Sequence, residues 1–220
     1  MISKKGSVFL KVFWCVALLI ALFFGFCETA QKDVSDKIVR LHVVANSNSE
    51  VDQAVKLSVR DAILKTASGK NGGKDITLLS VEENREELLS AADKVLKENG
   101  CTYGCVLETG RFSFPVKSYE NITLPAGKYD AVRVVLGEGQ GENWWCVMFP
   151  PLCFSESTKG ALTAENEKAL KEMVSESSYA AISDEVITLK PAFKAVELWN
   201  EFAGKVRKEY GKRMVSAKNR

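Results

Sequence analysis

The sequence predicts an α+β domain over residues 38–154, in which two helices cover one face of a mainly antiparallel sheet in the order βααββββ. Apolar and polar residues alternate over residues 38–45, and the same period of two returns over most of residues 103–149. Between them, residues 49–98 carry apolar residues at helical spacing. The 220 residues suffice for one such domain with appendages, among them a predicted C-terminal amphipathic helix.

The first thirty residues predict export. Lys4 and Lys5 form a basic start, and residues 12–27 carry no charge. This run lies between the roughly 7–15 apolar residues of a signal peptide and the roughly 20 of a membrane-spanning helix. Small residues suited to cleavage are present but poorly spaced: Gly25, Cys27, Thr29 and Ala30. We expect residues 1–30 to be a cleaved signal peptide, with an N-terminal membrane anchor as the alternative.

The domain is predicted to begin with a strand over residues 38–45, in which His42 and Val43 point to opposite faces. Four residues that are common in turns and at helix N-termini follow it: Asn46, Ser47, Asn48 and Ser49. Ser49 and Asp52 have the spacing of a capping box, so the first helix is expected to start there.

A second helix is predicted to begin at Ser80, with Glu83 as its capping partner, and to stop at Asn99 and Gly100. The period of two that follows predicts four strands, at residues 103–109, 112–118, 128–136 and 144–149. A tight turn at residues 109–111 is expected to join the first two of them.

The C-terminal part of the sequence is more polar. Residues 155–190 are predicted to form a linker, with a weak helical pattern over residues 165–174. Residues 191–213 predict an amphipathic helix, and a basic tail continues to residue 220. We expect this helix to pack on its own domain, with contact to an anionic membrane surface as the alternative.

Export changes the interpretation of the cysteines, because disulfides form outside the cytoplasm. Four cysteines lie beyond the signal segment: Cys101, Cys105, Cys146 and Cys153. Cys146 and Cys153 flank a rigid proline pair, and we predict a disulfide between them, while Cys101 and Cys105 could close a second small loop. The C-x3-C and C-x6-C spacings do not suit a zinc site. Free, buried thiols are the alternative.

Several classes of function find no support in the sequence. Without residues 1–30 the charges balance, so nothing favours binding to nucleic acid. His42 is the one histidine, and no motif supplies it with a nucleophile, so we expect a structural or surface role. The glycine run over residues 137–141 follows a strand, but no helix opens after it, so a hairpin connection is expected rather than a phosphate loop.

A hydrolase that uses two carboxylates stays open as an alternative, because sequence spacing does not reveal the separation of the groups in space. The acids that qualify are Asp52, Asp61, Asp130 and Glu142. No catalytic signature accompanies them. We therefore predict a binding or signalling protein and not an enzyme, with no catalytic residue, no cofactor and no metal ligand.

Residues 141–154 concentrate aromatic side chains, prolines and cysteines. Trp144 and Trp145 are neighbours in a predicted strand, so their rings point to opposite faces of the sheet. Two arrangements are open. Either one ring is exposed for recognition, or the sheet is covered on both faces, with the helix of residues 191–213 on the second.

Two segments are similar to a known family. Residues 38–64 (IVRLHVVANSNSEVDQAVKLSVRDAIL) and residues 124–154 (LPAGKYDAVRVVLGEGQGENWWCVMFPPLCF) resemble stage II sporulation protein R, and residues 112–119 (FSFPVKSY) fit the same pattern. The resemblance implies a protein exported from the forespore into the space between the forespore and mother-cell membranes, soluble or membrane-anchored. There it would activate a membrane-embedded aspartic protease, which cleaves the precursor of the early mother-cell sigma factor.

A ligand activates a receptor by binding its active state more tightly than its inactive state. We therefore expect a receptor-binding surface with aromatic anchors and a polar rim. The candidate residues are Trp144, Trp145 and Phe149 as anchors, and Asn46, Ser47, Asn48 and Asp52 as the rim. Beside the receptor protease, the membrane surface is a possible partner, through the N-terminal segment or the C-terminal helix. The alternatives are a secreted cell-wall or peptide hydrolase and an exported binder of a small ligand.

Overall fold

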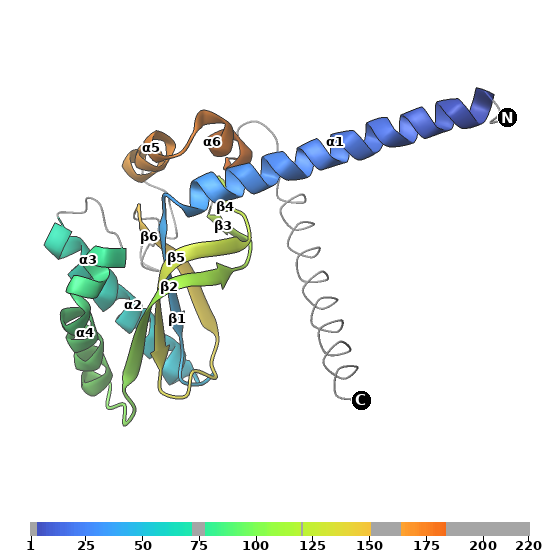
Figure 1. Ribbon diagram of the computed structural model, residues 1–220. Coiled ribbons are helices and arrows are strands. Elements are labelled where there is room, and N and C mark those ends of the chain that lie inside the picture. Colours follow the sequence, from blue (N-terminus) through green and yellow to red (C-terminus); the bar gives the residue numbers. More distant parts are fainter. Residues whose placement is uncertain (1–3, 72–77, 120, 151–163, 184–220) are drawn as a thin grey trace, which may run out of the picture.

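A computed structural model describes residues 4–71, 78–119, 121–150 and 164–183 of the chain (Figure 1). The helices in these ranges are α1 (Lys4–Ser35), α2 (Glu50–Asn71), α3 (Leu78–Glu83), α4 (Arg85–Glu98), α5 (Ala164–Met173) and α6 (Glu176–Ile182). The strands are β1 (Val39–Val44), β2 (Cys105–Phe114), β3 (Lys117–Tyr119), β4 (Ile122–Leu124), β5 (Gly127–Leu136) and β6 (Asn143–Phe149).

The main sheet has four strands in the order β2-β5-β1-β6, and β3 pairs with β4 in a separate hairpin (Figure 1). β1 runs parallel to β5, whereas the pairs β2–β5 and β1–β6 are antiparallel. β1 lies in the interior of the sheet, where Val43 is opposite Val134 on one side and Trp144 on the other. The predicted α+β class and the mainly antiparallel sheet are thus confirmed.

Both faces of the sheet are covered, and each has its own core. The first core lies under α2 and α4, and its fully buried side chains include Leu41, Val43 and Val59. The second core lies under the end of α1, α5, α6 and the β3–β4 hairpin, and includes Ile122 and Tyr129. Cover on both faces was one of the two arrangements that the sequence left open. The elements that provide it here are α1, α5 and α6, since residues 191–213 lie outside the described residues.

The predicted tight turn at residues 109–111 is wrong. β2 passes through these residues as one strand, paired with β5 from Cys105 opposite Leu136 to Phe114 opposite Gly127. Gly110 has φ +153°, a value that few other residues adopt, so the glycine serves an irregular strand conformation and not a reversal. The continuous ladder with β5 outweighs the local turn propensity.

The predicted second helix is divided. Ser80 lies inside α3, so its predicted role at the start of a capping box is wrong. α4 begins after Asn84, and the helix ends as predicted: Gly100 has φ +69°, and the backbone N–H of Cys101 donates to the carbonyl of Leu96 at 3.0 Å.

Residues 164–183 are part of the fold and not a linker. The predicted helical pattern corresponds to α5, and α6 follows after Ser175, whose side chain caps it. Leu170, Tyr179 and Ile182 are buried in the second core. The linker prediction is therefore corrected for these residues, because the apolar positions in this polar segment fall on one side of two short helices.

Candidate functional site

The loop between β1 and α2 is organised around Asp52. The backbone N–H of Asp52 donates to Ser49 Oγ at 3.1 Å, which confirms the predicted helix start. Ser47 Oγ and Asn46 Nδ2 donate to Asp52 Oδ2 at 2.5 and 2.9 Å, and the hydroxyl of Tyr103 donates to Oδ1. The carboxylate is buried, so these donors fix the shape of the loop.

The connection between β5 and β6 (residues 137–142) is bound to this same loop. Three of its backbone N–H groups donate to the β1–α2 loop side: Gln140 to the Asn46 carbonyl at 3.1 Å, Gly141 to the Ala45 carbonyl at 2.9 Å, and Glu142 to Asn48 Oδ1 at 2.8 Å. We call the two connections with Asp52 and Tyr103 the loop cluster.

The remaining backbone N–H groups of this connection also donate hydrogen bonds within the protein. Glu138 donates to Asn46 Oδ1 at 3.0 Å, Gly139 to the Leu136 carbonyl at 3.0 Å, and Gly137 to the Gly104 carbonyl at 2.9 Å. Because every N–H from residue 137 to residue 142 has a partner in the protein, none is left to bind a phosphate. The predicted hairpin connection is wrong, however, because β1 lies between β5 and β6 in the sheet, so the glycine run crosses over the end of β1.

Gly141 is a point of close approach in the loop cluster. A Cβ at this position would collide with the Ser47 carbonyl and with the Ala45 side chain. We therefore expect Gly141→Ala to lower the free energy of unfolding by about 1–3 kcal/mol, because backbone atoms cannot yield without breaking the loop contacts. Gly104→Ala is the matched control, since nothing lies within 4 Å of its added Cβ. Equal urea midpoints for the two variants would contradict the contact.

The lowered pKa of Asp52 makes the stability of the fold depend on pH. Hydrogen bonds from Ser47, Tyr103 and Asn46 lower it from 3.8 to about 2. A depressed pKa stabilises the fold above the unfolded-state value near 4, and this contribution is lost as the pH falls toward 2. We expect the stability difference between the wild type and Asp52→Asn to shrink over that interval in urea unfolding. A difference that stays constant from pH 6 to about pH 2 would contradict the role of the carboxylate.

Part of the loop cluster and the adjoining first turn of α2 are open to solvent. Asn48, Ser49, Glu50 and Val51 are exposed, and Val51 keeps 65% of its surface accessible. Asn46 and Ser47 are only half-buried, but their side chains are engaged with Asp52. The four predicted rim residues are thus brought together, and Asn48 is the exposed one among them.

Trp144 and Trp145 point to opposite faces, as predicted. Trp144 packs against the first core, and the guanidinium carbon of Arg60 lies 4.4 Å from its ring centroid. Trp144 Nε1 and Arg60 Nη1 are buried and have no hydrogen-bond partner in the described part of the chain. Both tryptophans are half-buried, so neither is a freely exposed anchor.

Trp145 lies on the second face and stacks on His42, with ring centroids 3.7 Å apart. His42 is buried, and its Nε2 lies 2.7 Å from Asn143 Oδ1. Burial lowers the pKa of His42, and the hydrogen bond to Asn143 only partly opposes this effect. The stacked, hydrogen-bonded ring fits the structural role predicted for His42.

Arg40 is a residue that sequence reasoning did not single out. Its side chain is fully buried on the second face, between the rings of Phe114 at 4.4 Å and Tyr129 at 5.0 Å. Arg40 Nε donates to the Cys146 carbonyl at 3.0 Å and Nη2 to the Tyr119 hydroxyl at 3.0 Å. Its position in the apolar strand, on the same side as His42, was the one available signal.

Phe149 does not join the other candidates. It is opposite Val39, at the start of β1, whereas Asn143 is opposite Val44 at the other end. The seven predicted receptor-binding residues therefore do not form one surface. The rim residues lie at the loop end of the sheet with Trp144 near them, and Phe149 lies at the far end.

The cysteines behave differently from one another. Cys146 is disulfide-bonded, as its predicted pairing requires, but Cys153 lies outside the described residues, so the pairing itself stays a prediction. Cys101 and Cys105 are free, so the second small loop is not closed. Burial and the nearby Asp93 carboxylate raise the pKa of Cys105 to about 12, which keeps its thiol protonated.

The four acidic residues considered as catalytic carboxylates of a hydrolase each have different partners. Asp52 belongs to the loop cluster, Asp61 pairs with Arg60 at 2.8 Å, and Asp130 lies 3.4 Å from Arg111 near the opposite end of the sheet. The backbone N–H of Glu142 donates to Asn48 Oδ1, and its carbonyl accepts from Lys56 Nζ. Among the described residues, no three metal-ligating side chains come together.

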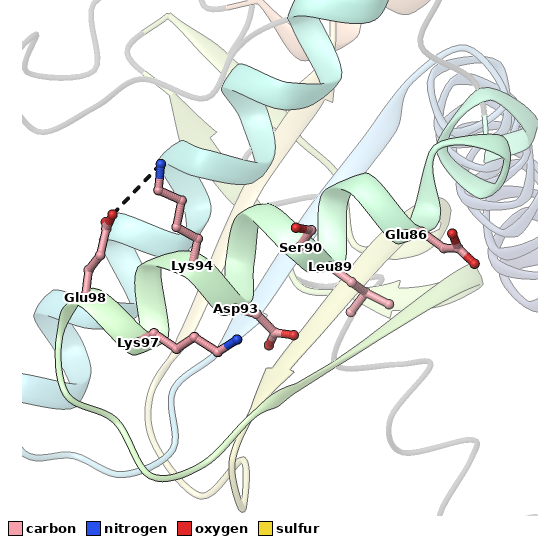
Figure 2. A pocket seen from close by; sticks show the side chains of 7 residues that line it. All are labelled: Glu86, Leu89, Ser90, Asp93, Lys94, Lys97 and Glu98. Atoms are coloured by element: carbon pink, nitrogen blue, oxygen red, sulfur yellow. Dashed lines mark ion pairs between the residues drawn. The ribbon is translucent and has the colours of Figure 1, made fainter.

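Figure 2 shows a surface hollow along α4. It is lined by Glu86, Leu89, Ser90, Asp93, Lys94, Lys97 and Glu98. Leu89 is its one large apolar side chain, and Lys94 and Glu98, one turn apart on α4, form an ion pair at 3.9 Å. Small-molecule sites are mostly apolar and aromatic, so this lining gives no support to a small-ligand binder.

Fold and site together define an α+β domain built onto the end of an apolar N-terminal helix. Among the described residues, α1 is the one helix long and apolar enough to cross a membrane, which is compatible with a signal peptide or an anchor. The family model described as stage II sporulation protein R matches residues 35–159. The chain therefore belongs to the stage II sporulation protein R family and has a role in sporulation.

A curated relative from Bacillus subtilis (strain 168), named stage II sporulation protein R, is 39% identical over 153 residues. The match covers 64% of this chain and 66% of the relative. The match thus spans slightly less than two thirds of the relative's length. No solved structure matches.

Proposed function

We propose that the chain is an exported sporulation signal that activates a membrane-embedded aspartic protease of the mother cell. The protease then processes the precursor of the early mother-cell sigma factor. Membership of the family and the apolar α1 support this proposal. The chain supplies recognition in this mechanism, and the cleavage chemistry belongs to the protease.

The loop cluster is the observation that carries the proposal. Its backbone is held by Asp52 and by the β5–β6 connection, so Asn48, Glu50 and Val51 are presented in a fixed arrangement. A preorganised surface loses little conformational freedom on binding. If it binds the active receptor more tightly by about 1.4 kcal/mol, the equilibrium shifts tenfold.

The set of residues that we assign to receptor contact differs from the set predicted from the sequence. We assign receptor contact to Asn48, Glu50 and Val51, which are exposed at the start of α2. Asn46, Ser47 and Asp52 act as positioning residues, because their polar groups are already engaged within the loop. Trp145 and Phe149 are left out, because Trp145 packs on the other face of the sheet against His42 and Phe149 lies at the far end of β1.

Reconstitution in a bacterium that does not sporulate tests the proposal. The host expresses the receptor protease and the sigma-factor precursor, with or without export of this chain. We expect precursor cleavage only when the chain is exported, and none from a variant lacking residues 1–26. Absence of cleavage with a well-folded, exported chain would overturn the proposed activation.

A parallel assay separates signalling from hydrolysis. The purified chain is incubated with cell wall and with peptide substrates, beside the single variants Asp61→Asn and Asp130→Asn. The proposal expects no activity from any of them. Hydrolysis that either substitution abolishes would replace the signalling assignment with an enzymatic one.

A further inference from the structure

The two halves of α1 lie in different surroundings. From Leu10 to Phe26 its large apolar side chains are exposed all around the helix. From Cys27 onward one side is buried in the second core, where Cys27 and Ala30 are each 2% exposed and Val34 is 0% exposed. These positions recur at helical spacing, so the last turns of α1 pack as an ordinary core helix.

Polar contacts from three other elements hold the same turns. Asp33 Oδ2 accepts the backbone N–H of Ser175, which precedes α6, at 2.9 Å. Arg111 Nη2, on β2, lies 2.8 Å from Asp36 Oδ1 just beyond the helix. The side chain of Gln31 lies directly against the backbone of Gly127, at the start of β5. The end of α1 is therefore fixed to the domain and is not a leader attached to it.

The exposed half fits a lipid bilayer. The exposed residues 10–26 lie at the short end of the roughly 17–25 residues that a span needs, and the most apolar stretch of 18 residues in this helix has a mean hydropathy of 2.4. Lys4, Lys5 and Lys11 lie at its beginning, and residues 12–27 are uncharged. An apolar surface of this extent is unfavourable in water. Hydrocarbon is the surrounding that its composition suits on every side.

We propose that α1 is retained as an uncleaved membrane anchor, whose last turns are a permanent part of the second core. The residues suited to cleavage, 25–30, lie at the junction of the two halves within one continuous helix. Cleavage after Ala30 would remove both Cys27 and Ala30 from the core. The inference rests on the export that the proposed function assumes.

Retention also orients the domain. No linker separates the exposed half from the docked half, so the domain stands directly at the membrane. α1 contacts α6 and β5 on the second face, and α2 and α4 lie on the other side of the sheet (Figure 1). The side of the domain that carries α2, and with it Val51, is therefore presented away from the anchor.

The test is the intact mass and fractionation of the exported chain carrying a C-terminal tag. We expect the bulk of the chain in the membrane fraction, released by detergent but not by high salt, with peptides from before residue 25 still attached. A soluble chain whose N-terminus lies between residues 26 and 31 would overturn the proposal. Neither readout needs the receptor protease, so the result is independent of whether activation occurs.

A matched pair of variants tests the docking itself. Val34→Asp places a carboxylate in the second core, whereas Lys32→Asp places it on the exposed side of the same turns. We expect Val34→Asp to undock the helix and make residues 25–31 accessible to cleavage in isolated membranes treated with protease, and Lys32→Asp to resemble the wild type. Equal cleavage of the two variants would contradict docking, and the wild-type mass remains decisive if Val34→Asp does not fold.

Discussion

Arg40→Ala is expected to lower the free energy of unfolding by about 3–5 kcal/mol. The guanidinium is fully buried between Phe114 and Tyr129, and donates to the Cys146 carbonyl and the Tyr119 hydroxyl. Alanine would leave a cavity and remove both hydrogen bonds at once. Urea unfolding of the detergent-solubilised chain, followed by tryptophan fluorescence, measures the loss.

Two further substitutions show what Arg40 contributes. Arg40→Met keeps much of the volume without a charge, so we expect a smaller loss than with alanine. Arg111→Ala removes an arginine that is half-exposed, and its exposed ion pairs are worth about 0–1 kcal/mol. A loss for Arg40→Ala no larger than that for Arg111→Ala would show that the buried cluster does not hold the second face together.

Asp52→Ala is expected to destabilise the domain by about 2–4 kcal/mol and to abolish precursor processing. The change removes the acceptor of Ser47, Asn46 and Tyr103, so the exposed part of the loop loses its fixed shape. Urea unfolding and the processing assay of the reconstituted host measure the two effects separately.

Glu50→Ala is the matched control for the stability measurement alone, because Glu50 is an exposed acid in the same first turn of α2 and is itself assigned to receptor contact. It should lower stability by about 0.3–1 kcal/mol through the helix dipole alone. Tyr103→Phe removes a single donor and should fall between the two, at about 1 kcal/mol. If Asp52→Ala is no worse than Glu50→Ala, Asp52 does not organise the loop cluster.

Local patterns predicted the parts of the fold that depend on local chemistry. The alternation in residues 38–45 identified β1, the spacing of Ser49 and Asp52 identified the start of α2, and the strand period placed Trp144 and Trp145 on opposite faces. These features depend on backbone geometry over a few residues, which the sequence determines directly.

The remaining features depend on contacts between distant segments. Residues 109–111 have turn propensity, but their pairing with β5 keeps them in a strand. The burial of Arg40 depends on Phe114 and Tyr129, which are distant in the sequence. The sequence did not predict that the last turns of α1 pack on the domain, because Cys27 and Ala30 were assigned to the apolar signal segment. No local pattern reveals which segment will cover a given face.

Two exposed valines allow a direct test of recognition through the loop cluster. Val51 is 65% exposed beside that cluster, and Val106 is 57% exposed on β2. Precursor processing is measured in the reconstituted host with Val51→Asp and Val106→Asp, at equal amounts of exported chain. We predict that Val51→Asp lowers processing about tenfold or more, the effect of losing about 1.4 kcal/mol of receptor binding, and that Val106→Asp does not. Unchanged processing by Val51→Asp would contradict recognition through this surface.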